Sequence, residues 1–194
     1  FGGNVMATIR CADYRPQMAT VRPGVMKLAE AQPGKQGEVE DFKVEFTPED
    51  MNVTIKEVIK ETKKAVDITD AKVLVSGGRG IGSADYYKEL QKVADLLGGE
   101  ISSSRANVDA GWIAKDRQVG QTGKTVRPDL YLACGISGAI QHIAGMENSE
   151  CVISINKNDT AAIFDVSDLG IVGDVKVIIP KLIDALTKYK AAQN

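Results

Sequence analysis

The pattern of apolar and polar positions differs between the first third of the chain and the rest. From about residue 67 onward, short apolar runs of strand length are separated by stretches in which apolar residues recur every three or four positions, the spacing of a helix. The longest helical pattern ends at a pair of glycines, a common helix stop. Strands are predicted near 72–76, 100–104, 130–134, 151–155 and 170–173, and helices between Tyr86 and Leu97, through Ile140 and Ile143, and from Pro180 through Leu186.

Regular alternation of apolar strands with helices predicts the α/β class. We therefore expect residues 67–194 to form a Rossmann-like, mostly parallel sheet with helices on both faces. Ligands of such sheets bind at the carboxyl ends of the strands. The unusual glycine-rich and polar motifs of the chain nearly all follow a predicted strand, so we expect them to converge on one ligand.

Residues 1–66 are richer in turn signals and charges. Two strands are predicted here, near 4–10 and 38–46, and residues 54–66 have the composition of a surface segment or linker. This part has too few apolar residues for a secure core of its own. We expect a partial N-terminal α/β domain that ends at residue 66 and packs against a partner chain or a separate N-terminal fragment.

Composition narrows the classes of partner. With 43% hydrophobic and 26% charged residues the chain predicts a globular core, and its net charge of -2 gives no general attraction to nucleic acid or anionic membranes. Aromatic residues make up only 5%, which argues against a base-stacking surface. No apolar run approaches the roughly 20 residues of a membrane span, and no secretory signal is evident. Because the chain starts at Phe1, we expect a processed or proteolysed product.

Cysteine and histidine are scarce. The three cysteines, Cys11, Cys134 and Cys151, are widely spaced, and the single histidine is His142. No pair has CxxC spacing, so no metal site is expected. Buried, reduced thiols in a reducing compartment are the preferred interpretation.

The glycine-rich segment 77–83 lies between a predicted strand and a predicted helix, as a phosphate-binding loop does. Arg79 within it supplies a forked cation. Ser83 replaces the third glycine of a GxGxxG fingerprint, and the next strand ends in serines and Arg105 instead of an acidic ribose ligand. The motif is therefore a weak dinucleotide signal, and a tight turn with an exposed arginine is the alternative.

Three further loops carry polar groups at strand ends. Ser104 and Arg105 could place a hydroxyl and a charge against a ligand, although a surface ion pair from Arg105 to Asp109 explains the latter equally simply. Segment 118–124 offers backbone donors and a hydroxyl to a heteroaromatic ring, with an ordinary turn as the alternative. Segment 135–142 permits close approach to a ligand, although a lone histidine such as its His142 is more often structural.

No catalytic apparatus is evident in the sequence. There is no Ser–His–Asp order, no paired acid with a credible substrate pocket, and no Walker spacing around Lys124. We expect no catalytic residues. Two alternatives remain open at this point: a nicotinamide-dependent oxidoreductase and a nucleotide-binding module without redox chemistry.

Taken in order, these motifs resemble the alpha (large) subunit of electron-transfer flavoproteins over essentially all of residues 70–186. The string at 15–24 is similar to the end of that family's first domain, so residues 1–66 correspond to a C-terminal remnant of this domain with a linker, and residues 67–194 to the FAD-binding domain. The matching strings are VLVSGGRG (73–80), SRANVDAGW (104–112), QVGQTGK (118–124), GISGAIQH (135–142), INKND (155–159) and DLGIVGDV (168–175).

The resemblance implies an electron carrier and not an enzyme. It implies one FAD, a heterodimer with a smaller beta subunit, and electron donors that are dehydrogenases such as acyl-CoA dehydrogenases, with a further acceptor that in some family members belongs to a bifurcating complex. The compartment it implies is the bacterial cytoplasm, in preference to the mitochondrial matrix.

The resemblance also implies the cofactor contacts. A cation near the flavin pyrimidine stabilises the negative charge that the ring gains on reduction, and only Arg105 and His142 have suitable charge and reach. Arg79 is implied near the flavin or its phosphates, Ser104 on the cofactor, Arg105 over the ring, Val119, Gly120, Gln121 and Thr122 along the ring with Thr122 near N5, Ser137, Gly138, Ala139, Ile140, Gln141 and His142 around the pyrimidine and ribityl chain, and Asn156, Asp174 and Val175 at the adenosine end.

Overall fold

The structure is a computed structural model that describes residues 8–21, 26, 29–51, 53–58 and 66–193. It divides into two units, one made of Phe1–Met26 with Val66–Asn194 and the other of Lys27–Ala65. The domain boundary expected between residues 66 and 67 stays a prediction. In the described chain no helix is both long and apolar enough to cross a membrane.

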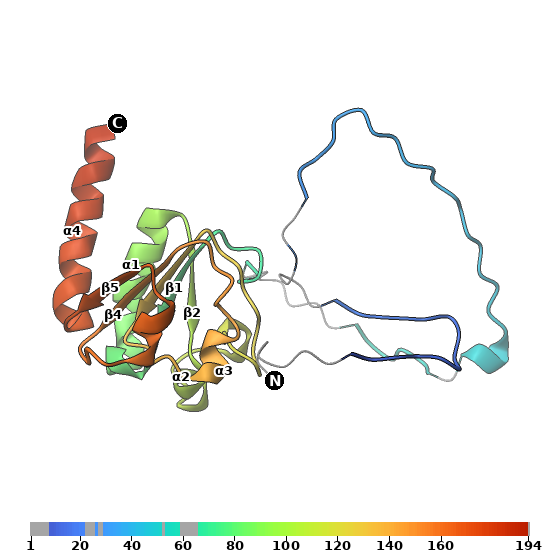
Figure 1. Ribbon diagram of the computed structural model, residues 1–194, viewed down its shortest axis with the longest axis horizontal. Helices are drawn as coiled ribbons and strands as arrows, with labels where there is room; N and C mark the ends of the chain where they lie inside the picture. The colour runs from blue at the N-terminus through green and yellow to red at the C-terminus, as the bar shows by residue number, and fades with distance from the viewer. Residues whose placement is uncertain (1–7, 22–25, 27–28, 52, 59–65, 194) are drawn as a thin grey trace. The chain divides into compact units, whose positions relative to one another are not determined.

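The described residues before position 66 contain one regular element, the 3-10 turn η1 (Pro48–Asp50) (Figure 1). The strand expected over 38–46 is not formed, and that expectation was wrong for this chain. Val39 is 91% exposed and Phe42 is 84% exposed. A strand is stable only beside a neighbour that pairs its backbone groups, and these residues pair with none in the described chain. The strand expected over 4–10 falls largely outside the described residues.

The described strands form one parallel sheet, in the order β2-β1-β3-β4-β5 (Figure 1). The α/β fold expected from the sequence is confirmed. The chain leaves β1 toward β2 and leaves β3 toward β4, in opposite directions across the sheet. This reversal creates a crevice at the carboxyl ends of β1 and β3. The strands are β1 (Val73–Gly77), β2 (Glu100–Ser103), β3 (Leu130–Cys134), β4 (Val152–Asn156) and β5 (Leu169–Val172).

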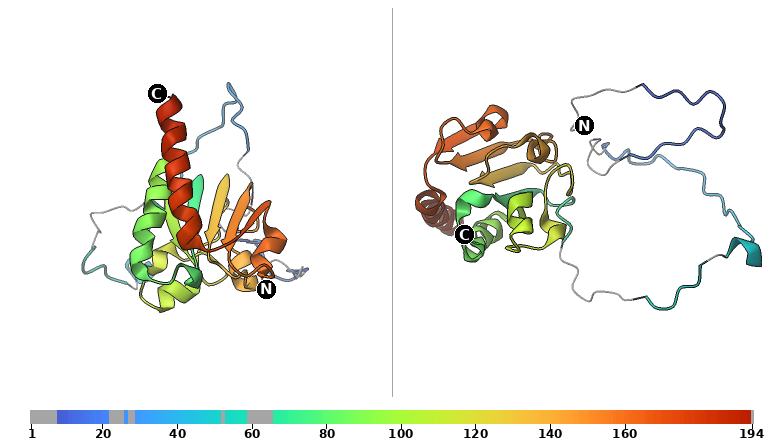
Figure 2. Two further views of the ribbon diagram at one scale, coloured as in Figure 1. Left: turned by 90° about the vertical axis from the view of Figure 1, so that its left-hand side faces the viewer. Right: turned by 90° about the horizontal axis from the view of Figure 1, so that it is seen from below.

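Helices cover both faces of the sheet, but unequally. The long helices α1 (Tyr87–Leu97) and α4 (Val175–Gln193) pack against each other and against one face (Figure 2). The short α3 (Ile140–Ile143) and η5 (Ala162–Val166) belong to the other face, and α2 (Arg105–Asp109) follows β2 at its carboxyl end. The remaining turns of this unit are η2 (Arg79–Ile81), η3 (Ala84–Tyr86) and η4 (Lys115–Arg117).

Each face has its own apolar core. Under α1 and α4, the helix residues Leu90 and Ile179 are fully buried against strand residues such as Val75. On the opposite face, Leu74 and Tyr131 are buried with side chains of the connecting segments. Burial of apolar surface on both faces stabilises a parallel sheet, whose strands then read as continuous apolar runs.

The last helix begins earlier than the sequence predicts. Pro180 was expected to open it, whereas α4 begins at Val175 and contains Pro180. The carboxylate of Asp174 accepts a hydrogen bond from the N–H of Lys176 at 2.8 Å and so caps the first turn. Proline tolerates this place because it lacks only the single N–H that would bond one turn back, to Lys176.

A buried hydrogen-bond network joins β1, β2 and α2. The Tyr87 hydroxyl lies 2.6 Å from Oγ of Ser103 and 3.2 Å from the carbonyl oxygen of Gly77. Nδ2 of Asn107 donates to the Tyr87 hydroxyl at 2.9 Å and to the same carbonyl at 3.2 Å. The network fixes α2 against the carboxyl ends of β1 and β2, which are the strands that precede the first two polar motifs.

We expect Tyr87→Phe to lower the free energy of unfolding by about 1–3 kcal/mol, because buried partners of the hydroxyl lose a hydrogen bond. The matched control is Tyr189→Phe on α4, where the side chain is 62% exposed and the expected change is within about 0.5 kcal/mol. Urea unfolding of ligand-free protein, followed by the fluorescence of Trp112, measures both. Equal effects of the two substitutions would contradict a role for this network.

Candidate cofactor site

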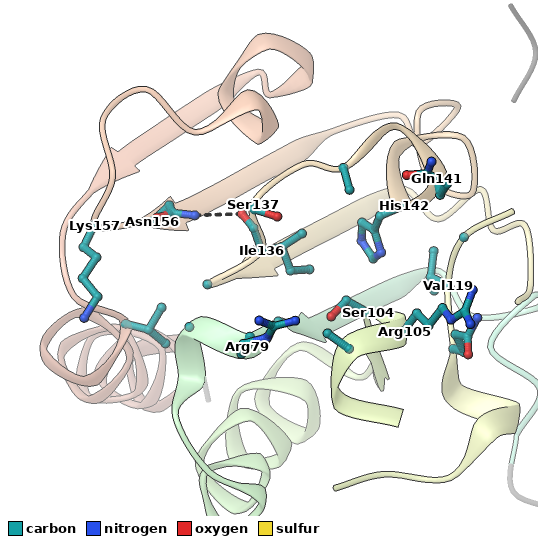
Figure 3. Close-up of a pocket in the computed structure, with 18 of the residues that line it drawn as sticks. Arg79, Ser104, Arg105, Val119, Ile136, Ser137, Gln141, His142, Asn156 and Lys157 are labelled. Atoms are coloured by element: carbon teal, nitrogen blue, oxygen red, sulfur yellow. Dashed lines mark hydrogen bonds between the residues drawn. The ribbon is translucent and has the colours of Figure 1, made fainter. Parts of the chain in front are cut away.

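A pocket of about 530 Å³ opens at the carboxyl end of the sheet. The loops after β1 and β2 form one wall and those after β3 and β4 form the other; Figure 3 shows Arg79 and Ser104 facing Ile136 and His142 across it. The lining residues are Gly78, Arg79, Gly80, Ser104, Arg105, Ala106, Gln118, Val119, Gly120, Gln121, Thr122, Gly135, Ile136, Ser137, Ala139, Gln141, His142, Asn156, Lys157, Gly173, Asp174 and Val175.

The expected cofactor residues line this pocket, with two exceptions. Gly138 and Ile140 are not among the lining residues, and Ile140 is exposed. Gly138 has a structural role instead: its φ is +88°, and a Cβ there would lie 2.1 Å from the backbone nitrogen of Ile163. The sequence thus anticipates the location of the pocket, whereas contact of these residues with a cofactor stays a prediction.

Other lining residues were not singled out from the sequence. They are mainly neighbours of the expected ones in the same loops, and Lys157 follows Asn156 at the end of β4. A cation directly after a strand was the available signal for Lys157. Nothing in the sequence distinguishes Gln118, which is buried and whose Nε2 donates to the Thr122 hydroxyl at 3.0 Å.

The loops after β1 and β3 contact each other through backbone atoms. The N–H of Gly78 donates to the carbonyl of Cys134 at 2.9 Å, and that of Gly80 to the carbonyl of Gly135 at 3.0 Å. A Cβ on Gly78 would lie 2.3 Å from the Gly135 oxygen, and one on Gly80 would lie 2.8 Å from the Gly135 Cα. Glycine is therefore required at 78 and 80 by loop packing, whatever binds beside them.

A second backbone contact holds the 118–124 segment in place. The N–H of Val119 donates to the carbonyl of Ser103 at 2.9 Å, and the N–H of Gln121 donates to the carbonyl of Gln141 at 2.7 Å. Gly120 has a φ of +138° and passes so close to Gln141 that a Cβ would lie 2.7 Å from its oxygen. These bonds tie the segment to β2 and to α3, so it is a fixed part of the wall.

Asn156 and Asp174, two of the expected cofactor residues, also form hydrogen bonds within the fold. Nδ2 of Asn156 donates to the carbonyl of Ile136 at 2.8 Å, and Oδ1 of Asn156 accepts from the N–H of Asn158 at 2.9 Å. Figure 3 shows the first of these bonds. The carboxylate of Asp174 caps α4. These side chains connect β4, β5 and α4 around the pocket.

Positive charge is concentrated on the pocket wall. Arg79 and Lys157 have no ion-pair partner in the described chain. Arg105 does pair with Asp109, at 3.2 Å, but both side chains are well exposed, and such pairs contribute little to stability. Arg105 thus makes the surface ion pair and also lines the pocket, whereas its contact with a ligand stays a prediction.

His142 is the buried polar side chain of the pocket. It is 6% exposed, and its Nε2 lies 2.9 Å from the Tyr131 hydroxyl. Its Nδ1 is buried and has no hydrogen-bond partner among the described residues. Burial lowers the pKa of His142 from 6.5 to about 4, with the Val119 backbone acting in the opposite direction. The imidazole is therefore neutral at physiological pH.

Groups that would suggest a different chemistry lie elsewhere or are inert. Within the described residues no cluster of three or more His, Cys, Asp and Glu side chains could hold a metal ion. Burial raises the pKa of the Cys134 thiol to about 12, which keeps it protonated. Cys11, by contrast, is exposed, so the expectation of buried thiols holds for Cys134 and is wrong for Cys11.

The pocket fits a nucleotide cofactor. Arg79 and Lys157 supply unpaired cations, and the N–H groups of Ser137 and Ala139 donate to no described backbone acceptor; all four suit phosphate and ribose oxygens. Nδ1 of His142 is a further unpaired polar atom in a wall that also carries apolar side chains such as Ile136. The fold and the pocket together define a cofactor-binding domain of the doubly wound α/β class.

Comparison with known families identifies the chain. Residues 67–147 match the electron transfer flavoprotein FAD-binding domain, and residues 1–47 match the electron transfer flavoprotein domain. The chain belongs to the electron transfer flavoprotein alpha subunit family, and the cofactor of the matched domain is FAD.

Curated relatives agree with this assignment. The chain is 55% identical to an electron transfer flavoprotein subunit alpha of Thermoanaerobacterium thermosaccharolyticum over 98% of its own length and 58% of the relative's. It is 53% identical to that of Clostridium acetobutylicum, over 100% and 57%. It is 50% identical to the acryloyl-CoA reductase electron transfer subunit beta of Anaerotignum propionicum, over 99% and 54%. The chain thus spans a little over half the length of these relatives.

We expect the imidazole of His142 to stay neutral as pH falls from 8 to about 4, as followed by NMR titration of its ring protons. Because the folded pKa lies below the ordinary 6.5, the unfolded chain binds this proton first. Its contribution to stability is complete above pH 6.5 and is lost as pH falls toward 4, by roughly 3 kcal/mol at most. A titration midpoint near 6.5 would show that the ring is not desolvated.

Proposed function

We propose that the protein is the FAD-holding subunit of an electron carrier, which accepts electrons from a dehydrogenase and passes them to a further acceptor. The observation that carries this proposal is the composition of the pocket. Unpaired cations for phosphate oxygens and a buried, neutral histidine lie on loops fixed to one another by backbone hydrogen bonds.

We infer that the two ends of the pocket bind different parts of FAD. Asn156 and Lys157 lie at one end and Gln141, Val119 and Arg105 at the other (Figure 3). The first end suits the adenosine and phosphate part of FAD, together with Arg79, Asp174 and Val175. The second suits the ring, with Ser104, the 119–122 segment and the 137–142 segment around it. When bound, FAD supplies the exchange of one or two electrons.

The residues around the ring end would tune its chemistry. Arg105 offers a planar cation that can lie over an aromatic ring and can leave its exposed partner Asp109 at little cost. The ring end is also desolvated by Val119 and Ile136, which strengthens electrostatic interactions inside the pocket. Thr122 accepts a hydrogen bond from Gln118 and thereby has its hydroxyl proton free for the cofactor.

A beta subunit is the partner that we propose. Exposed apolar residues before position 66, among them Val39 and Phe42, are suited to an interface with another chain or fragment. An acyl-CoA dehydrogenase is the donor class we favour, since one relative is named as a subunit of acryloyl-CoA reductase. We expect this assembly in the bacterial cytoplasm. The nicotinamide alternative is disfavoured because Ser104 and Arg105 follow β2 where a ribose-binding acid would stand.

The test of this function is the identity of the cofactor in the intact complex. Full-length protein co-expressed with its partner subunit is expected to be yellow and to release FAD in a 1:1 ratio to this subunit on denaturation, as measured by absorption and mass spectrometry. A reduced acyl-CoA dehydrogenase should then bleach that colour. Release of NAD, or of a nucleotide without flavin, would contradict the proposal.

Arg105→Ala is expected to change the redox potential of bound FAD more than its affinity. A cation beside the ring interacts more strongly with the reduced, negative form, and roughly 1.4 kcal/mol of such preference is tenfold in the redox equilibrium, or about 30 mV for a two-electron couple. We therefore expect a lower midpoint potential with FAD still largely bound. Spectroelectrochemical titration and the FAD content after gel filtration measure the two quantities.

Two further variants complete this experiment. Arg105→Lys keeps the charge without the planar group, so it should restore only part of the potential. Lys88 of α1 forms an exposed ion pair with Asp85 of η3, outside the pocket. Lys88→Ala removes this cation and should leave the potential unchanged. If Arg105→Ala released FAD without altering the potential, Arg105 would be a binding residue only.

A further inference from the structure

A buried tyrosine lies directly behind the pocket histidine. Tyr131 of β3 is fully buried, and its hydroxyl oxygen is 2.9 Å from Nε2 of His142. The two rings are tilted by 58°, with 6.1 Å between their centroids. One nitrogen of the imidazole is therefore already bonded inside the protein, and Nδ1 is the nitrogen without a hydrogen-bond partner among the described residues.

The state of Nδ1 depends on the direction of the Tyr131–His142 hydrogen bond. A neutral imidazole carries one N–H and one lone pair. If the Tyr131 hydroxyl donates to Nε2, the ring proton is on Nδ1, which is then a donor. If Nε2 donates to the tyrosine, Nδ1 is an acceptor. The two tautomers present opposite chemistry to a ligand.

Two buried serines bear on which direction is adopted. Ser76 on β1 and Ser102 on β2 are neighbours in the sheet register, and Ser76 is also opposite Ala133 of β3, two residues beyond Tyr131. Side chains two residues apart on a strand share a face, so both hydroxyls lie on the face that carries the phenol. Neither hydroxyl forms a hydrogen bond with a described residue, so neither accepts the phenol proton of Tyr131.

A comparison of the hydrogen bonds that are possible with each tautomer favours the tyrosine as the donor to histidine. Ser76 and Ser102 are fully buried, and neither hydroxyl has a hydrogen-bond partner in the described chain. If Tyr131 donates to Nε2, its buried hydroxyl proton has an acceptor. If Nε2 donates to Tyr131, the phenol proton has no other acceptor in hydrogen-bond geometry among the described residues. Buried donors without acceptors are costly.

We propose that Tyr131 is a positioning residue that donates its hydroxyl proton to Nε2 of His142 and thereby holds the imidazole in the tautomer whose Nδ1–H is a donor to the cofactor pocket. This inference rests on the proposed function only for the identity of the acceptor, an oxygen or nitrogen of the flavin ring. A fixed neutral donor in a desolvated site favours the negative charge of the reduced ring. The hydroxyl of Tyr131 thus contributes to the redox potential without touching the cofactor.

The tautomer can be read directly by NMR. Full-length protein in complex with its partner is labelled with ¹⁵N-histidine, and the His142→Asn variant assigns the His142 signals by their loss. We expect Nδ1 protonated and Nε2 unprotonated in the wild-type protein, with and without FAD. A proton on Nε2 would overturn the proposal. Because the FAD-free protein gives the same information, failure to load FAD would count against the proposed function alone.

Tyr131→Phe keeps the ring and removes the hydroxyl. We expect it to shift or mix the His142 tautomers and to change the redox equilibrium of bound FAD by about three- to tenfold toward the oxidised form, the usual worth of one hydrogen bond. Tyr189→Phe, at an exposed site on α4, should change neither quantity. If Tyr131→Phe lowered thermal stability while leaving the tautomer and the potential unchanged, the tyrosine would have a packing role only and the proposal would be wrong.

Discussion

The loops after β1 and β3 touch through backbone atoms, with glycines on both sides of the contact. These two strands are adjacent in the sheet, and the chain leaves them in opposite directions across it. A side chain at Gly78 or Gly80 would push the loops apart and alter the floor of the pocket. Every other wall is anchored to this contact: α2 through the Tyr87 network on Gly77, the 118–124 segment through Ser103, and α3 through the loop that begins at Gly135.

The pocket combines two electrostatic environments that depend on different degrees of solvent access. The cationic side chains of Arg79, Lys157 and Arg105 are exposed, whereas burial of an unpaired charge would be costly. His142 is desolvated and neutral, so it can form a directional hydrogen bond but contributes no net charge. Cations for phosphate oxygens and a neutral polar group for a ring are the combination that a flavin nucleotide requires, and the family of the chain is consistent with it.

Buried polar groups of the domain gather under this site. Ser76, Ser102, Tyr131 and His142 lie on one face of the sheet, and Tyr87, Ser103 and Asn107 lie near the ends of β1 and β2. The hydrogen bonds among Tyr87, Ser103 and Asn107 and between Tyr131 and His142 restrict these side chains, while Nδ1 of His142 has no partner in the described chain. Their position beneath a ligand pocket means that orientation of the polar groups, and not apolar packing alone, is what the interior contributes to function.

The sequence by itself determined the sheet, the family and the loops that form the pocket, because strand runs and glycine motifs are local features of the chain. Strand limits such as Leu130–Cys134 followed directly from apolar length. The local sequence could not decide whether residues 38–46 form a strand, since a strand depends on a pairing partner. The start of α4 is set by the cap of Asp174, five residues before the position that Pro180 suggested. A cation directly after a strand was a local signal for Lys157. Only the tertiary structure brought the Tyr131 hydroxyl to His142, because this contact joins β3 to α3 and has no local signature in the sequence.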